Sequence, residues 1–448
     1  MNTTIRKIID DTFDQQVEDL KTLVSFPSVS RGTPEPGMPL GRHVDGALNA
    51  ALTLAKKLGF PNARSLDGYC GLVDYGEGDE MLMIMAHIDV VPAGPAWKSD
   101  PFRAEIRDGR MYGRGVIDDK GPLVSTLYAL HAVKEAGIPL KRRVRILMGC
   151  DEEVDWACIN RYKQTEPEPD LAFTPDGDYP VVHSEMSICH AEYTLKLTGS
   201  DVRIDCGIAS NVVPGEAVAE LSCPAVPVRA PKTVNIAVDG NRITVTGRGG
   251  HAAMPDLAVN ALCYLFDALT MQQLSPEDLS AATALHAMFG YDLHGEGFGL
   301  DVSDDSGRLT LQPTMVRWDE NGVKVTLDCR HPLSLTEEEL QKKLDETFGA
   351  VGFARASFKD SLGHYIAPDS ELVSTLLDIY AEHSGQRLPS EAIGGGTYAR
   401  AFKNAVAFGA EPHNAPAEAH MPDESTGLEE MRFNTVVIAD AITRLAGK

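Results

Sequence analysis

Three apolar segments near the start of the chain have the length and composition of buried strands. They span residues 81–86 (MLMIMA), 144–149 (VRILMG) and 171–173 (LAF). The ranges 46–58 and 122–136, which precede and separate them, have helical spacing with glycine or proline at their boundaries. Strands that alternate with helices are typical of a mostly parallel sheet with helices packed against it. We therefore predict an α/β fold for this part of the chain.

The pattern changes at about residue 184, and from there to about residue 362 short strands with alternating apolar residues dominate. One predicted hairpin turns at Asp239-Gly240, a dipeptide that favours tight turns. Two helices interrupt the strands, one at 256–269 and one that begins at Thr336 with a capping-box pattern. Strands with helices segregated between them predict an α+β domain.

After this region the α/β pattern returns, with a predicted helix at 369–383 and a short buried strand at 405–408. A chain of 448 residues is also too long for one ordinary core. We therefore predict an α/β domain made of residues 1–183 and 364–448, split by an inserted α+β domain at 184–363.

The charge of the chain excludes two classes of partner. It has 41 Lys and Arg against 65 Asp and Glu, a formal net charge of −24. A surface this acidic repels nucleic-acid backbones and anionic lipids. We expect neither nucleic acid nor a membrane as a partner.

The cysteines and the N-terminus indicate the cellular compartment. The eight cysteines are scattered and form no C-x-x-C pair, which suits reduced thiols better than a disulfide framework. Residues 1–20 have apolar residues at helical spacing and lack the continuous apolar stretch of a signal peptide. We expect a cytoplasmic protein.

Each of the three predicted strands runs directly into ionisable residues. They are His87 and Asp89 after the first strand, Asp151, Glu152 and Glu153 after the second, and Asp176 after the third. The carboxyl ends of parallel strands meet at one edge of a sheet, so we expect these side chains to converge. Convergent carboxylates repel one another unless a cation lies among them. The sequence therefore predicts a site for divalent metal ions at this edge.

Two further segments can contribute ligands. Asp118 and Asp119 lie in the glycine-containing segment GRGVIDDKGP, just before a predicted helix, and His420 lies in the segment HMPDE. Two imidazoles and three carboxylates are enough for two metal ions that share one carboxylate. The residues alone leave open whether Asp118 or Asp119 is shared. They also leave His413, seven positions before His420, as a competing ligand.

Six motifs together resemble one known family. They are HIDVVPAG at 87–94, GRGVIDDKGP at 113–122, DEEVDW at 151–156, TPDGDYP at 174–180, GGGTYAR at 394–400, and His420. In this order and spacing they resemble the co-catalytic metallopeptidases that include dipeptidase PepV, carnosinase, aminoacylase and succinyl-diaminopimelate desuccinylase. The resemblance spans nearly the whole chain, and GGGTYAR with the long insertion is most similar to the PepV-like dipeptidases. It implies a zinc-peptidase-like catalytic domain with an inserted lid domain.

The resemblance also implies a ligand set. His87 and Asp176 would hold one divalent metal ion, Glu153 and His420 a second, and Asp118 would bridge the two. Zinc is the default for mixed imidazole and carboxylate ligands, with manganese or cobalt as alternatives.

Roles in catalysis and substrate binding follow from the same resemblance. Glu152 would be the general base, and Asp89 would orient the imidazole of His87. His251 would stabilise the tetrahedral oxyanion and Arg330 would pair with the free carboxylate of a short peptide. Three more residues would contact or admit the substrate: Asn211, Gly395 and Gly396.

The expected activity is hydrolysis of the amide bond of dipeptides, and three alternatives remain open. The same metal chemistry could serve an N-acyl amino acid deacylase or desuccinylase. A non-catalytic homologue could bind metal or peptide, although such a site has no need of Glu152. A carboxypeptidase acting on longer chains would need an open cleft. We expect a monomer, with a homodimer as the alternative, because a large lid can supply contacts that smaller relatives take from a partner.

The sequence departs from the dipeptidase branch at one point. That branch has a short polar motif with asparagine and glutamate after the final histidine, whereas here Asp423 and Glu424 follow Met421 and Pro422.

Overall fold

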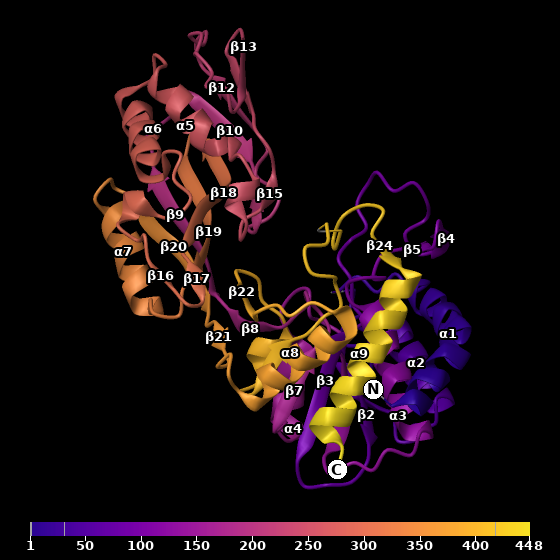
Figure 1. The fold of residues 1–448 in the computed structure, drawn as a ribbon. Helices are drawn as coiled ribbons and strands as arrows, with labels where there is room; N and C mark the ends of the chain where they lie inside the picture. Colours follow the sequence, from indigo (N-terminus) through magenta and orange to yellow (C-terminus); the bar gives the residue numbers. More distant parts are fainter. Residues whose placement is uncertain (1, 31, 417) are drawn as a thin grey trace. The chain divides into compact units, whose positions relative to one another are not determined.

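The computed structural model describes residues 2–30, 32–416 and 418–448. The chain divides into two compact units, which are drawn with element labels in Figure 1. The first unit comprises Met1–His183, Tyr365–Glu391 and Thr397–Lys448, and the second comprises Ser184–His364 and Ala392–Gly396. The described residues nearest to both ends of the chain therefore belong to the first unit.

The central sheet of the first unit is mixed. Its strands follow the order β1 (Arg64–Leu66), β2 (Cys70–Tyr75), β6 (Arg143–Gly149), β3 (Met81–His87), β7 (Leu171–Thr174) and β23 (Ala405–Ala407). The four strands from β6 to β23 are parallel, whereas β1 and β2 run antiparallel to their neighbours. Beyond β23 the sheet continues to β8 (Val182–Glu185), which pairs antiparallel with β23. The α/β prediction is confirmed, with antiparallel pairing on both sides of the parallel strands.

Side chains on the two faces of this sheet enter two different cores. Leu82 and Ile84 of β3 join the larger core, which the helices α1 (Thr3–Val24), α2 (Arg42–Lys57), α3 (Lys120–Glu135), α8 (Glu371–Ser384) and α9 (Leu428–Ala446) complete. Met83 and Met85 face the opposite way, toward α4 (Ala157–Thr165). Since successive side chains of a strand alternate between faces, a continuous apolar strand such as β3 suits a sheet covered on both sides.

Several shorter elements complete the first unit and its junctions. A small antiparallel sheet is formed by β24 (Ser425–Gly427), β5 (Arg110–Tyr112) and β4 (Glu105–Arg107). Three short strands lie where the chain passes from one unit to the other: β8 (Val182–Glu185), β21 (His364–Tyr365) and β22 (Glu391–Ile393).

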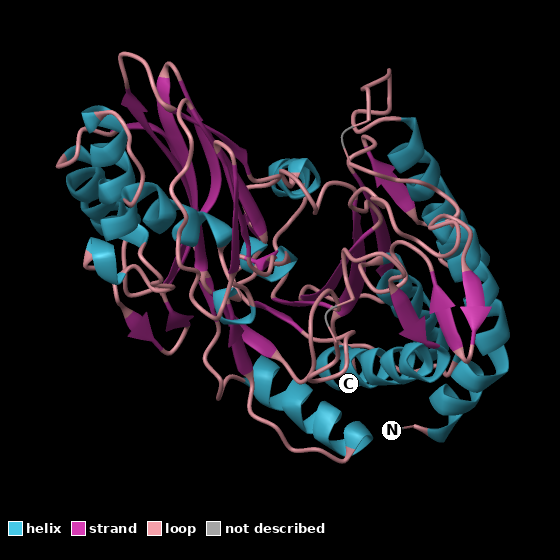
Figure 2. Ribbon diagram, turned by 90° about the horizontal axis from the view of Figure 1, so that it is seen from above, coloured by secondary structure: helices cyan, strands magenta, loops and turns pink. Residues whose placement is uncertain are grey.

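The second unit is built on an antiparallel sheet of eight strands. Their order is β13 (Asn235–Asp239), β14 (Arg242–Thr246), β12 (Glu216–Leu221), β10 (Val202–Cys206), β18 (Thr310–Asp319), β19 (Gly322–His331), β9 (Ser187–Lys196) and β20 (Ala354–Ser361). Burial alternates along β9 and β14, which is typical of a sheet with one face on a core. Figure 2 shows helices running beside the strands of each unit.

The helices of the second unit are α5 (Ala261–Thr270), α6 (Pro276–Phe289) and α7 (Glu337–Gly349), and their apolar residues share a core with this sheet. Thr336 and Glu339 form the predicted capping box of α7. The hairpin predicted at Asp239-Gly240 joins β13 to β14. An inserted α+β fold is thereby confirmed. No helix of the described residues is long and apolar enough to cross a bilayer.

Candidate metal centre

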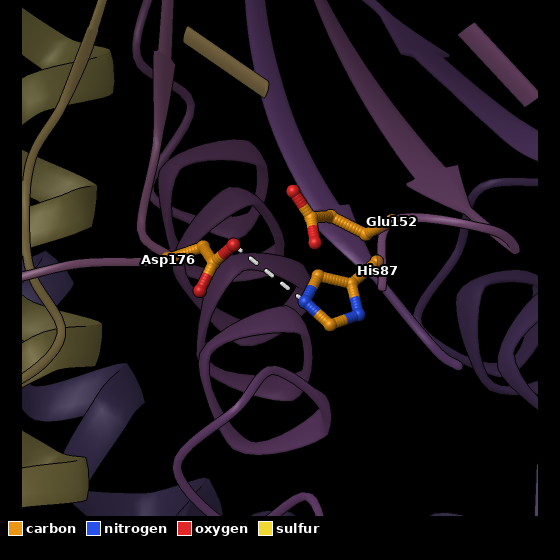
Figure 3. A group of neighbouring side chains, drawn as sticks. All are labelled: His87, Glu152 and Asp176. Atoms are coloured by element: carbon orange, nitrogen blue, oxygen red, sulfur yellow. Dashed lines mark ion pairs between the residues drawn. The ribbon is translucent and has the colours of Figure 1, made fainter. Parts of the chain in front are cut away.

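The carboxyl edge of the first unit's sheet gathers the ionisable residues that the sequence predicts there. His87 ends β3 and is level with Gly149, the last residue of β6, so the residues after β6 begin beside it. Asp176 follows β7, the parallel neighbour of β3 on its other side. Figure 3 shows Glu152 and Asp176 with their carboxylates directed to the space beside the His87 ring. The convergence follows from the parallel order of β6, β3 and β7.

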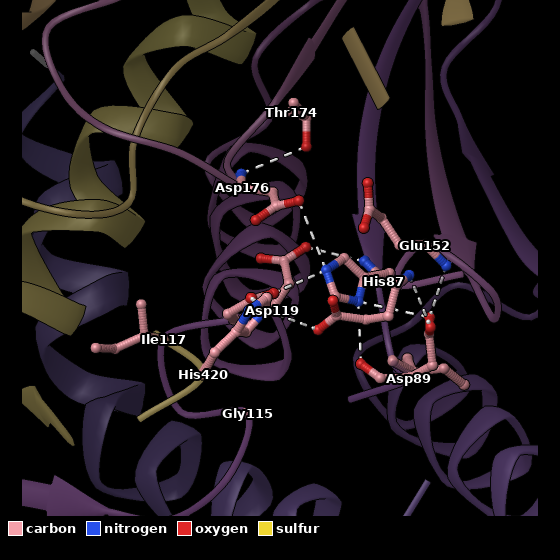
Figure 4. A network of polar contacts seen from close by, with 12 residues as sticks. His87, Asp89, Gly115, Ile117, Asp119, Glu152, Thr174, Asp176 and His420 are labelled. Atoms are coloured by element: carbon pink, nitrogen blue, oxygen red, sulfur yellow. Dashed lines mark hydrogen bonds and ion pairs between the residues drawn. The ribbon is translucent and has the colours of Figure 1, made fainter. Parts of the chain in front are cut away.

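Asp118 lies between two histidines. Its Oδ1 atom is 2.9 Å from His87 Nε2, and its Oδ2 atom is 2.8 Å from His420 Nε2. His87 Nε2 is also 3.6 Å from Asp176 Oδ2, and His420 Nε2 is 3.2 Å from Glu153 Oε1. Each histidine therefore has its own carboxylate and shares Asp118 with the other. Figure 4 labels His87, Asp176 and His420 in a close view of this network.

Three atoms at this place are buried without a hydrogen-bond partner among the described residues. They are His87 Nε2, Asp118 Oδ1 and Glu153 Oε1. Although His87 Nε2 and Asp118 Oδ1 are close, their directions do not satisfy a hydrogen bond. Unpaired buried polar atoms are costly in a protein, and imidazole and carboxylate are ligands for divalent cations. The residues present therefore fit metal ions.

The possible ligand atoms form two overlapping groups, and within each group all the atoms lie within 4.8 Å of one another. One group comprises His87, Asp118 and Glu153, and the other comprises His87, Glu152 and Asp176. The second group places Glu152 as close to the histidine as the implied ligands, which leaves it able to act either as a ligand or as a base.

The electrostatics of these side chains also favour the binding of a cation. Burial raises the pKa of Glu153 to about 7, and the negative charge of Asp118 adds to this. Burial and the charge of Asp176 raise the pKa of Glu152. Burial acts against the ionised form of Asp118, yet the adjacent imidazoles of His420 and His87 outweigh it and lower that pKa. Carboxylates that repel one another in this way are stabilised together by a bound cation.

Asp89 holds the main chain at this edge of the sheet and belongs to neither group of possible ligand atoms. Its buried carboxylate accepts the backbone N–H of Glu152 (3.1 Å) and of Glu153 (3.2 Å). Its main-chain oxygen lies 3.0 Å from His87 Nδ1. A proton on Nδ1 would bond to that oxygen and leave Nε2 free to bind a metal. If Asp89 orients His87 as predicted, the contact would run through its main-chain oxygen, since its carboxylate is 3.5 Å from His87 Nδ1.

The contacts of Asp119 and His413 bear on the two ligand choices that the sequence left open. The side chain of Asp119 accepts the backbone N–H of His87 at 2.9 Å, so it supports the strand end, whereas Asp118 faces both histidines. His413 Nδ1 is 3.1 Å from Glu391 Oε1. The geometry therefore favours Asp118 and His420 over their competitors.

The predicted substrate contacts belong to the second unit. His251 pairs with Val212 between two short antiparallel strands. The backbone N–H of Ala252 donates to the main-chain oxygen of Asn211 at 2.9 Å, so Asn211 and His251 are neighbours. The buried guanidinium of Arg330 donates twice to Asp328 and once to the Gly394 oxygen, each within 2.9 Å. Three of its five N–H groups are thus used within this unit, beside the predicted Gly395 and Gly396.

Three residues that sequence reasoning did not select also shape the centre. Arg114 and Glu424 form a buried ion pair beside Asp118. The ring of Tyr398 packs edge-on against His87 at 6.2 Å. Tyr398 lies within the GGGTYAR motif, which is the one signal that could have identified it.

Gly149 lies against Tyr398, and this contact gives a first prediction. A Cβ atom at residue 149 would stand 2.0 Å from the Tyr398 hydroxyl, so Gly149→Ala should displace one of them and cost about 1–3 kcal/mol. Gly349→Ala is the matched control, because nothing lies within 4 Å of its Cβ position. Thermal unfolding of both variants beside the unaltered protein tests this. Equal melting temperatures for the two variants would contradict it.

Comparison with known proteins agrees with this geometry. Residues 83–444 match the model of Peptidase family M20/M25/M40. The chain is 32% identical to the Beta-Ala-Xaa dipeptidase of Lactobacillus delbrueckii subsp. lactis, over 99% of both chains. Its fold is similar to that of the di-peptidase Dug1p from Saccharomyces cerevisiae (TM-score 0.61, 16% identity, 98% and 97% covered). The fold is also similar to that of human carnosine dipeptidase 1, with a TM-score of 0.59 and 14% identity over 98% of this chain and 97% of that one. The chain therefore belongs to Peptidase family M20/M25/M40 and is a metallopeptidase-type hydrolase.

Proposed function

We propose that this protein is a dipeptidase that hydrolyses the amide bond of free dipeptides with two divalent metal ions. The observation that carries the proposal is the position of Asp118, which presents one carboxylate oxygen to His87 and the other to His420. A carboxylate shared in this way suits two neighbouring ions. Asp176 beside His87 and Glu153 beside His420 would complete the two ligand sets.

The protein's own residues would carry the proton transfers. Two divalent ions supply positive charge that polarises a substrate carbonyl and favours ionisation of water. Glu152 would take the proton from the attacking water and return it to the leaving amine. Asp89 accepts the Glu152 backbone N–H, which fixes the main chain from which this side chain extends.

Five residues of the second unit are proposed to serve the substrate: Asn211, His251, Arg330, Gly395 and Gly396. His251 would stabilise the oxyanion. Arg330 would pair with the substrate carboxylate through the N–H groups that Asp328 and Gly394 leave unused. These roles rest on the resemblance of the motifs.

The dipeptide substrate is supported by the Beta-Ala-Xaa dipeptidase, which the chain matches along its whole length. We further propose zinc as the metal, with manganese or cobalt as alternatives, because the ligand set mixes imidazole with carboxylate. A monomeric state and a cytoplasmic location complete the proposal.

Removal of metal tests the proposed activity. The protein stripped with a chelator should release no amine from free dipeptides, and addition of zinc, manganese or cobalt should restore the release. N-acetyl and N-succinyl amino acids and tripeptides are measured beside the dipeptides, because they share the amide bond but differ at its ends.

Metal-dependent cleavage confined to free dipeptides is the expected result. A preference for acylated amino acids would move the activity to the deacylases, and a preference for tripeptides would indicate a broader peptidase. Dipeptide cleavage that is unaffected by the chelator would contradict the metal-dependent reaction.

A further inference from the structure

We propose that the buried ion pair between Arg114 and Glu424 positions His420 relative to Asp118, and thereby sets the affinity of the centre for one of its two metal ions. The inference rests on the proposed function, because it assumes two ions. It concerns the ion on the side of Glu153 and His420. Neither Arg114 nor Glu424 touches the space between the ligands, so both would be positioning residues.

Glu424 holds the turn that carries Asp118. Its side chain is fully buried, and its Oε1 atom accepts three backbone N–H groups in succession along that turn. The donors are Gly115 at 3.0 Å, Ile117 at 2.9 Å and Asp118 at 3.4 Å. Three N–H groups directed at one carboxylate oxygen restrain the main chain on both sides of Ile117, which Figure 4 labels beside Gly115 and His420.

Arg114 connects the same carboxylate to the histidine. Its Nη1 atom donates to Glu424 Oε2 at 2.5 Å, and its Nη2 atom donates to the main-chain oxygen of His420 at 3.1 Å. The side chain of Arg114 is only 1% exposed. Asp118 and His420, which are far apart in the chain, are thus joined through one guanidinium and one carboxylate, and buried bonds of this kind to charged groups are among the stronger ones in proteins.

His420 needs such a restraint more than His87 does. The side chain of His87 is 1% exposed at the end of a central strand, whereas that of His420 is 49% exposed on a loop. His420 and Asp423 also have positive φ angles of 65° and 60°, which cost non-glycine residues about 1 kcal/mol or more each. The loop therefore holds its shape only where surrounding contacts impose it.

A cavity borders the loop that leads to His420. A cavity of about 300 Å³ is lined by Val116 and Ile117 and, among other residues, by Glu411, Pro412, Ala415, Pro416 and Glu418 of the loop. Described residues before His420 therefore border a cavity, whereas Glu424 after it is buried. We infer that the polar contacts of Arg114 and Glu424, rather than apolar packing, determine where His420 stands.

The departure of Asp423 from the dipeptidase pattern fits this division of roles. Its carboxylate accepts the Lys98 N–H at 2.9 Å and lies 3.0 Å from Lys98 Nζ, so it ties the loop to a different, exposed segment. The glutamate of the motif is retained at Glu424, which makes the buried contacts.

The test is the binding of zinc to the metal-free full-length protein, measured by calorimetry and chelator competition. In Glu424→Gln, one ion should bind about 10- to 100-fold more weakly, as is common when a residue behind a metal ligand is replaced. The other ion should bind within about threefold of the unaltered protein. Activity at limiting zinc should fall and should recover with excess zinc.

Glu166→Gln is the matched control, because Glu166 also accepts a bond from a buried arginine, Arg145, at 2.7 Å. It lies outside the metal centre and should leave zinc binding unchanged. Since Glu424→Gln leaves Arg114 buried without its partner charge and could impair folding, the double variant Arg114→Met/Glu424→Gln is measured as well. It should show the same selective loss.

Two results would overturn the inference. One is binding of both ions by the double variant as tightly as by the unaltered protein. The other is an equal loss of affinity for both ions together with a lower melting temperature of the metal-free protein. That result would indicate that the Arg114–Glu424 pair has a purely structural role. If the unaltered protein itself binds fewer than two ions, the two-ion function fails first and the inference falls with it.

Discussion

Replacing Glu152 with glutamine should lower the rate of dipeptide hydrolysis by about 10²- to 10⁴-fold and leave the bound metal in place. The amide has nearly the shape of the carboxylate but cannot accept the proton of an attacking water. The backbone contact from Glu152 to Asp89 does not involve the altered group and should persist. The loss should appear in kcat, with little change in KM, because proton transfer takes place after the substrate has bound.

The measurement pairs the rate constants with the metal content. Glu166→Gln again serves as a control, since it makes the same chemical change in the first unit away from the centre. The metal content matters because Glu152 shares one group of ligand atoms with His87 and Asp176. Loss of one ion in Glu152→Gln would assign this residue as a ligand instead of a base, and a rate within a few fold of the unaltered protein would exclude both roles.

The parts of the site that the sequence predicts share a physical origin. His87, Glu152 and Asp176 each follow an apolar strand directly, and strand ends are visible in a sequence because the change from apolar to ionisable residues is abrupt. Parallel order then brings those ends together without further information. Local pattern and a general rule of topology therefore place three groups of one site.

The ion pair of Arg114 and Glu424 has no comparable signal. Its partners are separated by 310 positions, and each lies in irregular chain between elements. No periodicity marks a loop residue whose partner depends on how two distant segments meet. The resemblance identified the segment around His420 but not the contacts that hold it.

Helix boundaries show a milder form of the same difficulty. The helix expected at 122–136 begins at Lys120, because proline is tolerated throughout the first turn and does not mark a unique start. The helix expected from residue 256 begins at Ala261, where the Asn260 side chain accepts the Leu262 N–H. Residues 255–257 form a separate short turn of helix. Competing caps a few residues apart cannot be ranked without the tertiary contacts.

The boundary between the two units near Gly394–Gly396 could not be predicted from the sequence. Ala392–Gly396 is grouped with the second unit, while Tyr398 after it packs in the first. Arg330 donates to the main-chain oxygen of Gly394, and the Met186 N–H donates to the main-chain oxygen of Ile393, so both contacts tie this segment to the second unit. Glycines carry no apolar pattern, so a passage between units within seven residues leaves no trace in the composition.

Replacing Asp118 with asparagine should reduce activity by at least about 10³-fold, through loss of metal rather than loss of a proton acceptor. An amide keeps one oxygen that can bind a cation, while its nitrogen cannot, so only one of the two histidines keeps an oxygen partner. The lost negative charge also weakens attraction for both ions. Metal titration of the variant should therefore show one ion lost and the other bound more weakly.

Asp176→Asn is the informative comparison, because it makes the same change in a carboxylate that faces His87 alone. If Asp118 is shared, Asp176→Asn should weaken one ion and leave the ion near Glu153 and His420 close to its original affinity. Indistinguishable titrations for the two variants would contradict the shared carboxylate. The distances of 2.9 and 2.8 Å from Asp118 to the two histidines would then reflect attraction between charged side chains alone. Protonated imidazoles attract the same carboxylate that a bridging metal would.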